Sequence, residues 1–235
     1  MQLFYNPQIL KDTKLITFSK DESRHIVRVL RKKEQDTLHI TNGKGYLFTA
    51  KITIASDKKC IAAIVKTEQK EKHWNYYLHV AIAPTKNNDR LEWFLEKATE
   101  IGIDEITPII CQNSERKIVK MERLEKIIHA AAKQSLKYTM PILNPPLKFT
   151  DFIQQDFDEK VCIAHCGEGN KALLKNIVTP TEKLTIFIGP EGDFSSEEIQ
   201  QSIEKGFLAI SLGKSRLRTE TAGLMAVQNI AFINQ

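Results

Sequence analysis

The feature that most constrains the fold of this chain is a change of pattern near residue 72. Before that point, short alternating strands are separated by turn signals. Residues 37–41 alternate polar and apolar side chains, and the Asn-Gly-Lys-Gly sequence at 42–45 is typical of a hairpin turn. Strand character resumes over 46–54 and again over 60–67. The pattern predicts a small β-barrel in the N-terminal part.

Beyond residue 72, buried strands alternate with helices. The helix expected over 91–101 has apolar side chains at helical spacing and is followed by Gly102, a typical stop signal. Ser195 and Glu198 have the spacing of a capping box. We expect strands at 78–83, 106–110, 161–164, 184–188 and 208–212, and further helices at 121–137 and 219–232. The predicted fold class is therefore α/β with a mainly parallel sheet, divided into domains 1–72 and 73–235 by a polar linker at 68–72.

Composition excludes several classes of protein. No apolar run approaches the length of about eighteen residues that a membrane span needs, and the N-terminus lacks the layout of a signal peptide. Four scattered cysteines indicate reduced thiols and a cytoplasmic location rather than a disulfide framework. Cys162, His165 and Cys166 are close in sequence, but strand alternation directs them to different faces, so we expect no metal site.

Charge is unevenly distributed along the chain. Residues 1–72 contain 15 Lys and Arg against 8 Asp and Glu, whereas the rest contains 19 against 21. A predicted helix at 23–31 adds Arg24, Arg28 and Arg31 to this basic section. The asymmetry favours a polyanionic partner, most simply a nucleic acid, although a solvated lysine-rich surface gives the same composition.

Parallel sheets bind ligands beyond the carboxyl ends of their strands, and four such ends are rich in polar or glycine residues. Residues 167–172 match the dinucleotide pattern G-x-G-x-x-A, but an ordinary strand-to-helix turn is the favoured interpretation. Residues 186–195 contain two glycines, a proline and two carboxylates, which favours a ligand-binding loop. Residues 212–222 place Arg218 and Glu220 before an apolar helix, for which Thr219 or Thr221 could be the N-cap. Residues 86–90 offer two cations.

Together these segments resemble the SPOUT (α/β-knot) methyltransferases and, within them, the RsmE family of ribosomal RNA methyltransferases. The resemblance covers almost the whole chain because several motifs occur in order. They are Ile188-Gly189-Pro190-Glu191-Gly192, Leu212-Gly213, Leu217-Arg218-Thr219-Glu220-Thr221-Ala222, Lys97-Ala98-Thr99-Glu100-Ile101-Gly102, Ser114-Glu115-Arg116 and His25-Ile26-Val27-Arg28-Val29-Leu30-Arg31.

The resemblance implies a PUA-like β-barrel that binds RNA, followed by a C-terminal domain with a trefoil knot. It also implies methylation of N3 of a uridine, uracil-1498 in bacterial numbering, in 16S rRNA of the small subunit. The methyl donor implied is S-adenosylmethionine (SAM), and the enzyme is expected to act as a homodimer in the cytoplasm, without a membrane or a metal.

The chemistry of methyl transfer to uridine N3 then suggests roles for residues in these segments. Arg218 is expected to stabilise the uracil anion, while the base is left open between Glu191 and Glu220, with Asp193 third and Glu220 alternatively orienting Arg218. The expected cofactor-binding residues are Ala164, His165, Ile188, Gly189, Pro190, Glu191, Gly192, Leu212, Gly213, Leu217, Arg218, Thr219, Thr221 and Ala222. The expected RNA-binding residues are Arg24, His25, Arg28, Arg31, Lys32, Lys33, Lys86, Arg90 and Arg116.

The sequence departs from the family pattern in three places. Asp193 occupies the place of a second glycine, Lys133-Gln134-Ser135-Leu136-Lys137 replaces the commoner Glu-Gln-Ser-Gly-Arg, and Gln35 lies where glycine is frequent. These departures are expected to alter RNA contacts rather than the cofactor loops.

Other classes of function remain open at this point. A dinucleotide-dependent oxidoreductase rests on residues 167–172 alone. A non-catalytic ribosome-assembly factor would need the basic barrel but not the polar loops. A knotted methyltransferase acting on another RNA base or on ribose 2′-O differs only in its target.

Overall fold

The computed structural model describes residues 1–235, which form two compact units. The first unit comprises residues 1–73 and 132–140, and the second comprises 74–131 and 141–235. The sequence predicts a first domain of 1–72, and gives no sign that a segment from the middle of the chain belongs with it. None of the helices has both the length and the apolar character needed to span a bilayer.

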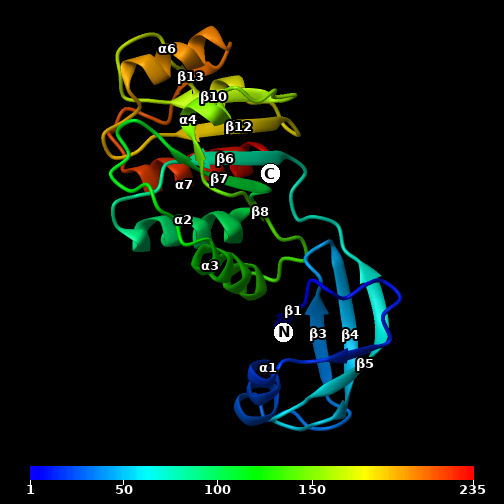
Figure 1. Cartoon of the computed structure of the whole chain (residues 1–235). Coiled ribbons are helices and arrows are strands. Elements are labelled where there is room, and N and C mark those ends of the chain that lie inside the picture. Colours follow the sequence, from blue (N-terminus) through cyan, green and yellow to red (C-terminus); the bar gives the residue numbers. More distant parts are fainter. The chain divides into compact units, whose positions relative to one another are not determined.

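The first unit is a five-stranded curled sheet around its own apolar core (Figure 1). The strand order is β1-β3-β4-β5-β2, and β1 and β2 at its two ends do not pair with each other. Phe48, Ile26 and Ile52 are fully buried in the core. The strands are β1 (Leu3–Tyr5), β2 (Leu15–Thr17), β3 (Thr37–Thr41), β4 (Tyr46–Ile54) and β5 (Ile61–Gln69).

Residues 138–140 join this unit at the hairpin turn between β3 and β4. The carbonyl of Tyr138 accepts hydrogen bonds from the amide of Gly45 (2.9 Å) and the hydroxyl of Thr41 (3.0 Å). The amide of Met140 donates to the carbonyl of Gly43 (2.9 Å). The predicted turn is therefore present, and a distant segment satisfies its backbone.

Two local predictions for this unit need correction. The helix expected over 23–31 is instead α1 (Lys20–Arg24) followed by a π-helical turn, η1 (His25–Val29). It starts earlier because the hydroxyl of Ser19 accepts a hydrogen bond from the amide of Glu22 and caps the helix. The linker expected at 68–72 is partly strand, since long β4 supplies backbone partners for β5 as far as Gln69.

The second unit is built on an eight-stranded parallel sheet. Its order is β11-β13-β10-β12-β6-β7-β8, and β9 also pairs with β7. The strands are β6 (Tyr77–Ile82), β7 (Glu105–Ile110), β8 (Ile142–Leu143), β9 (Leu147–Lys148), β10 (Lys160–Ala164), β11 (Ala172–Leu173), β12 (Lys183–Ile188) and β13 (Leu208–Ser211). The helices are α2 (Asn88–Ile101), α3 (Met121–Gln134), α4 (Phe149–Phe152), α5 (Leu174–Ile177), α6 (Ser196–Glu204) and α7 (Thr219–Ile233). The predicted Gly102 stop and the Ser195–Glu198 capping box are both confirmed.

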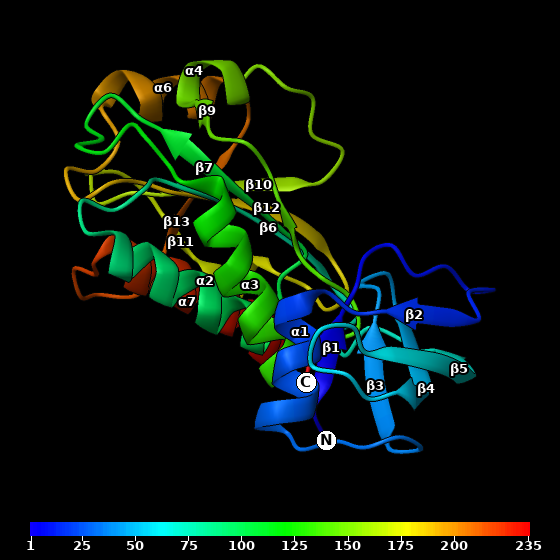
Figure 2. The same ribbon diagram turned by 60° about the horizontal axis from the view of Figure 1, so that its bottom comes forward.

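The central strands β6, β7, β10 and β12 bury both faces, as their continuous apolar runs predict. Along β6, Leu78 and Val80 pack into the core beneath α2, α3 and α7, whereas Ala81 belongs to an aromatic core beneath α4 and α6. Figure 2 shows these two groups of helices on opposite sides of the sheet. The final helix α7 packs against α2 and β6, and Gly223 permits this because a Cβ there would lie 2.8 Å from the ring of Phe94.

One residue in each of the three departures from the family pattern has the same unusual backbone conformation. Gln35, Leu136 and Asp193 have φ of +70°, +56° and +63°, the left-handed region that glycine adopts most readily. Gln35 is the third residue of a turn closed by a bond from the amide of Asp36 to the carbonyl of Lys33, where positive φ is required. The glycine preference at these positions is explained by backbone conformation.

Leu136 provides the second case, because it follows the end of α3. The amide of Lys137 bonds to the carbonyl of Ala132, and that of Leu136 to the carbonyl of Lys133. This is the Schellman pattern, in which the residue at the position of Leu136 is usually glycine.

Gln35 allows a direct test of the backbone strain that a positive φ imposes on residues other than glycine. Because Gln35 is exposed and left-handed, Gln35→Gly is expected to raise the free energy of unfolding by roughly 0.5–1 kcal/mol. Glu34→Gly, a control at the neighbouring exposed position without positive φ, is expected to lower it by a similar amount. Denaturant unfolding of the two variants measures the difference, and equal destabilisation by both would contradict the strain.

Candidate functional site

The loops that follow β10, β12 and β13 meet beyond the carboxyl ends of these strands and enclose two adjoining cavities. The smaller has a volume of about 290 Å³ and the larger about 620 Å³. Both are lined by Ala164, Cys166, Asp193, Arg216, Leu217 and Ala222. The smaller is completed by Ile188, Gly189, Pro190, Glu191, Arg218 and Thr219, and the larger by His165, Gly167, Lys171, Ile210, Ser211, Leu212, Gly213, Lys214 and Ser215.

The loop after β12 is held in one shape by hydrogen bonds along its length. The buried hydroxyl of Thr219 donates to the carbonyl of Gly189 (2.9 Å), which ties this loop to the start of α7. The side-chain amide of Asn113 donates to the carbonyls of Gly192 (3.2 Å) and Asp193 (3.1 Å). Gly189 is tightly packed, because a Cβ there would lie 3.0 Å from the ring of Phe194.

The loop after β10 is fixed by charged side chains. The ammonium of Lys171 donates to the carbonyls of His165 (3.1 Å) and Gly167 (2.5 Å). The amide of Cys166 donates to the carboxylate of Asp193 (2.7 Å), which joins this loop to the loop after β12. Burial, assisted by the charge of Lys171, lowers the pKa of His165, so the imidazole is neutral at pH 7. Its buried Nδ1 has no hydrogen-bond partner.

The three candidate catalytic residues lie in two different environments. Glu191 and Arg218 line the smaller cavity, and one oxygen of Glu191 accepts a hydrogen bond from the amide of Lys86 (2.9 Å). Glu220 lines neither cavity. Its side chain is 9% exposed and faces Arg90 of α2, with 3.8 Å between Oε1 and Nε, while Oε2 has no hydrogen-bond partner. Glu220 is thus paired with Arg90 rather than with Arg218.

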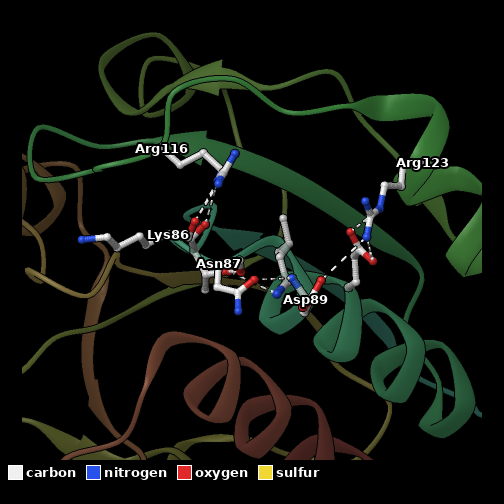
Figure 3. Close-up of polar contacts among 8 residues, drawn as sticks. Lys86, Asn87, Asp89, Arg116 and Arg123 are labelled. Carbon is white, nitrogen blue, oxygen red and sulfur yellow. Dashed lines mark hydrogen bonds and ion pairs between the residues drawn. The ribbon is translucent and has the colours of Figure 1, made fainter.

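The cations in the loops after β6 and β7 are mostly engaged within the protein. The guanidinium of Arg116 donates to the carbonyls of Thr85 (3.1 Å) and Lys86 (2.7 Å), and Figure 3 shows it directed at this backbone. The ammonium of Lys86 extends away from it and pairs with Glu115 at 2.8 Å. Arg116 therefore holds the loop after β6 in place.

In the first unit, the predicted RNA-binding residues differ in exposure and in pairing. Arg24, Arg31 and Lys33 are exposed, whereas His25 and Lys32 are half-buried. The set also contains Arg28, which donates two hydrogen bonds to Asp57, at 2.6 and 2.9 Å. This guanidinium holds the pKa of Asp57 below its ordinary value, so the pair is neutral at pH 7.

Two sequence-based interpretations are contradicted by the structure. The N-cap of α7 is Arg218, with no side-chain bond, because the hydroxyl of Thr219 is directed at Gly189 instead. No helix opens at the glycines of 167–172, since β11 and the four-residue α5 follow them. The dinucleotide pattern therefore lacks the helix N-terminus that would bind a pyrophosphate.

All the predicted cofactor-binding residues except Gly192 and Thr221 line one of the two cavities. The cavities also contain residues that sequence reasoning did not select, namely Cys166, Gly167, Lys171, Ile210, Ser211, Lys214, Ser215 and Arg216. Asp193, considered in the sequence as a third carboxylate and as a departure from the family pattern, lines both cavities. The Lys-Ser-Arg sequence at 214–216 lies between the predicted motifs at 212–213 and 217–222. This position was the sequence signal that could have identified these three residues as part of the site.

Comparison with protein families defines the class of the chain. The family model described as RNA methyltransferase domain matches residues 72–231, and the one described as RNA methyltransferase PUA domain matches residues 18–65. A parallel α/β domain with a ligand cavity, preceded by a PUA domain, is thus the architecture of an RNA methyltransferase.

Individual relatives narrow the assignment. Ribosomal RNA small subunit methyltransferase E of Buchnera aphidicola is 32% identical over 89% of this chain and 85% of its own. A probable rRNA-methyltransferase of Porphyromonas gingivalis superposes with a TM-score of 0.93 at 39% identity, covering 100% of this chain and 98% of the other. Ribosomal RNA small subunit methyltransferase E of Neisseria gonorrhoeae, solved bound to S-adenosyl methionine, gives 0.83 at 29% identity over 100% and 98%.

The chain therefore belongs to the ribosomal RNA small subunit methyltransferase E family. The resemblance inferred from its motifs is confirmed, and so is the predicted fold class of a PUA-like domain followed by a SPOUT α/β domain.

Proposed function

We propose that this protein transfers the methyl group of SAM to N3 of a uridine in 16S rRNA of the small ribosomal subunit, the position numbered uracil-1498 in bacteria. The observation that carries the proposal is the pair of cavities enclosed by the loops after β10, β12 and β13, in a chain whose Neisseria relative binds S-adenosyl methionine. The family membership supports rRNA as the substrate, and the motif resemblance supports N3.

The residues around the cavities fit such a cofactor. The combined space is of the size that nucleoside ligands occupy, and its walls join apolar side chains to exposed main chain. Main-chain groups at 188–192 and 212–217 are suited to an adenosyl group.

The chemistry required of the protein follows from the reactants. SAM supplies an electrophilic methyl group, so the protein must orient the uracil and manage one proton. Of the two carboxylates considered as bases, Glu191 lines the smaller cavity and retains one oxygen that no hydrogen bond occupies. We assign it as acceptor of the N3 proton.

Arg218 lines the same cavity and carries no ion pair, so its guanidinium is free to stabilise charge that develops on O2 and O4 of the uracil. Glu220, which is buried against Arg90, is proposed to position that arginine for an RNA contact. These two proposed roles make the assignment from the motifs more specific.

Assembly as a homodimer is part of the proposal. Met225 and Phe232 lie seven residues apart on the outward face of α7, and they are 38% and 69% exposed. Trp93 on the adjacent α2 is 42% exposed. Exposed apolar side chains on two helices that pack together suit a second copy of the chain. Light scattering of the purified protein, which distinguishes 26.9 kDa from twice that mass, tests it. We place the reaction in the cytoplasm, where ribosomal subunits are made.

The proposed function is tested by ligand binding followed by target mapping. Calorimetric titration is expected to show binding of S-adenosylhomocysteine and none of NAD. Cells lacking the gene are then expected to lose one N3-methyluridine from 16S rRNA. Binding of NAD alone would overturn the proposal. Loss of a different modification, such as a ribose 2′-O-methyl group, would show that the enzyme is an RNA methyltransferase that modifies another position.

Arg218 gives a mechanistic prediction. Arg218→Ala is expected to lower the rate of methyl transfer by about a hundredfold or more, because a charge-stabilising group is lost in the transition state. Binding of S-adenosylhomocysteine is expected to change by less than about twofold, and Arg218→Lys to recover part of the rate. Full activity in Arg218→Ala, with cofactor binding intact, would rule out this role.

The basic residues of the first unit give a prediction about salt dependence. If Arg31 neutralises a phosphate, Arg31→Ala weakens RNA binding and reduces the salt slope by about one. Arg28→Ala is the matched control, because its charge is already offset by Asp57, and a smaller change of slope is expected. Filter binding over a range of salt concentrations measures both, and an unchanged slope for Arg31→Ala would exclude the contact.

A further inference from the structure

Asp193 is the only acidic side chain that lines both cavities. Glu191, the other acidic residue of the site, lines only the smaller one. The remaining charged side chains of the walls are the basic residues Lys171, Lys214, Arg216 and Arg218. Asp193 is therefore the sole fixed negative charge of the larger cavity, at the border where the two cavities adjoin.

The carboxylate of Asp193 is held in place by backbone groups on both of its oxygens. Oδ2 accepts the hydrogen bond from the amide of Cys166 (2.7 Å), and Oδ1 accepts one from the amide of Phe194 (2.9 Å). The main chain of the residue is fixed as well, since its amide donates to the carbonyl of Pro190 and its carbonyl accepts from Asn113. Both oxygens and the main chain of Asp193 are thus fixed in position before any ligand enters.

A fixed negative charge distinguishes the methyl donor from the product. SAM carries a positive sulfonium, whereas S-adenosylhomocysteine has a neutral thioether at the same position. An anion within the cavity attracts the first and not the second, and does so more strongly than in bulk water because the loops partly exclude solvent. The glycine usual at this position in the family lacks the charge.

We propose that Asp193 is a specificity-determining residue, which makes the cofactor site prefer the cationic methyl donor over its neutral product. This inference rests on the proposed function, because it requires that SAM occupies the two cavities. Its consequence is easier exchange of product for donor after each methyl transfer. The hydrogen bond to Cys166 has a separate effect on loop position, and the test must distinguish the two.

Three ligands that differ in charge at one position provide the test. SAM and sinefungin are both cationic there, and S-adenosylhomocysteine is neutral. In Asp193→Asn, calorimetry is expected to show the affinities for SAM and sinefungin falling by about five- to tenfold, and that for S-adenosylhomocysteine changing by less than about twofold. Asp193→Gly, in which the positive φ is unstrained, guards against misfolding and is expected to show the same loss of preference.

Asn113→Ala is the matched control for a purely structural effect. It removes the bonds to the backbone of Gly192 and Asp193 but keeps the carboxylate, so the affinities for all three ligands are expected to fall together. If Asp193→Asn and Asp193→Gly also weaken all three ligands equally, or weaken none, the proposal is wrong. If the unaltered protein binds none of them, the proposed function fails first and this inference with it.

Discussion

The hydrogen bond from the buried hydroxyl of Thr219 to the carbonyl of Gly189 is the contact on which the site depends. It joins the start of α7 to the end of β12, two elements that are thirty residues apart in sequence. One turn further along the same face of α7, the close packing of Gly223 against Phe94 and Ile82 also fixes the helix. Since the cavity walls come from the loops on either side of this bond, the shape of the cofactor site follows from helix packing rather than from the loops alone.

Local patterns in the sequence predicted most of the regular structure and the main loops of the site. The hairpin at 42–45, the capping box at Ser195 and the strand ends that carry the cavities are all encoded within a few neighbouring residues. The sequence did not reveal contacts between distant segments, such as the bond from Cys166 to Asp193 or the joining of residues 138–140 to the first unit. The hydrophobic periodicity of the sequence does not indicate these pairings, because they depend on which strand ends the sheet brings together.

The basic residues illustrate why charge alone is a weak guide to binding. Arg116 and Lys171 hold backbone carbonyls, and Arg28 is neutralised by Asp57. These cations fix loops or offset carboxylates, whereas Arg218 on the cavity wall has no partner of its own. A basic composition therefore overstates the number of cations available to a polyanion, and the hydrogen-bond partner of each side chain is what separates the two groups.

The four cysteines differ in a way that has a practical consequence. Three are buried, and burial raises the pKa of the Cys162 thiol to about 12, so these three are poor nucleophiles. Cys166 alone is exposed, and it lines both cavities. A thiol-reactive fluorophore would thus attach at one place without any engineering of the sequence, and its emission would report whether the pocket is filled. Cys166 is therefore a native labelling site in the ligand cavity, where an inhibitor screen would need to detect binding.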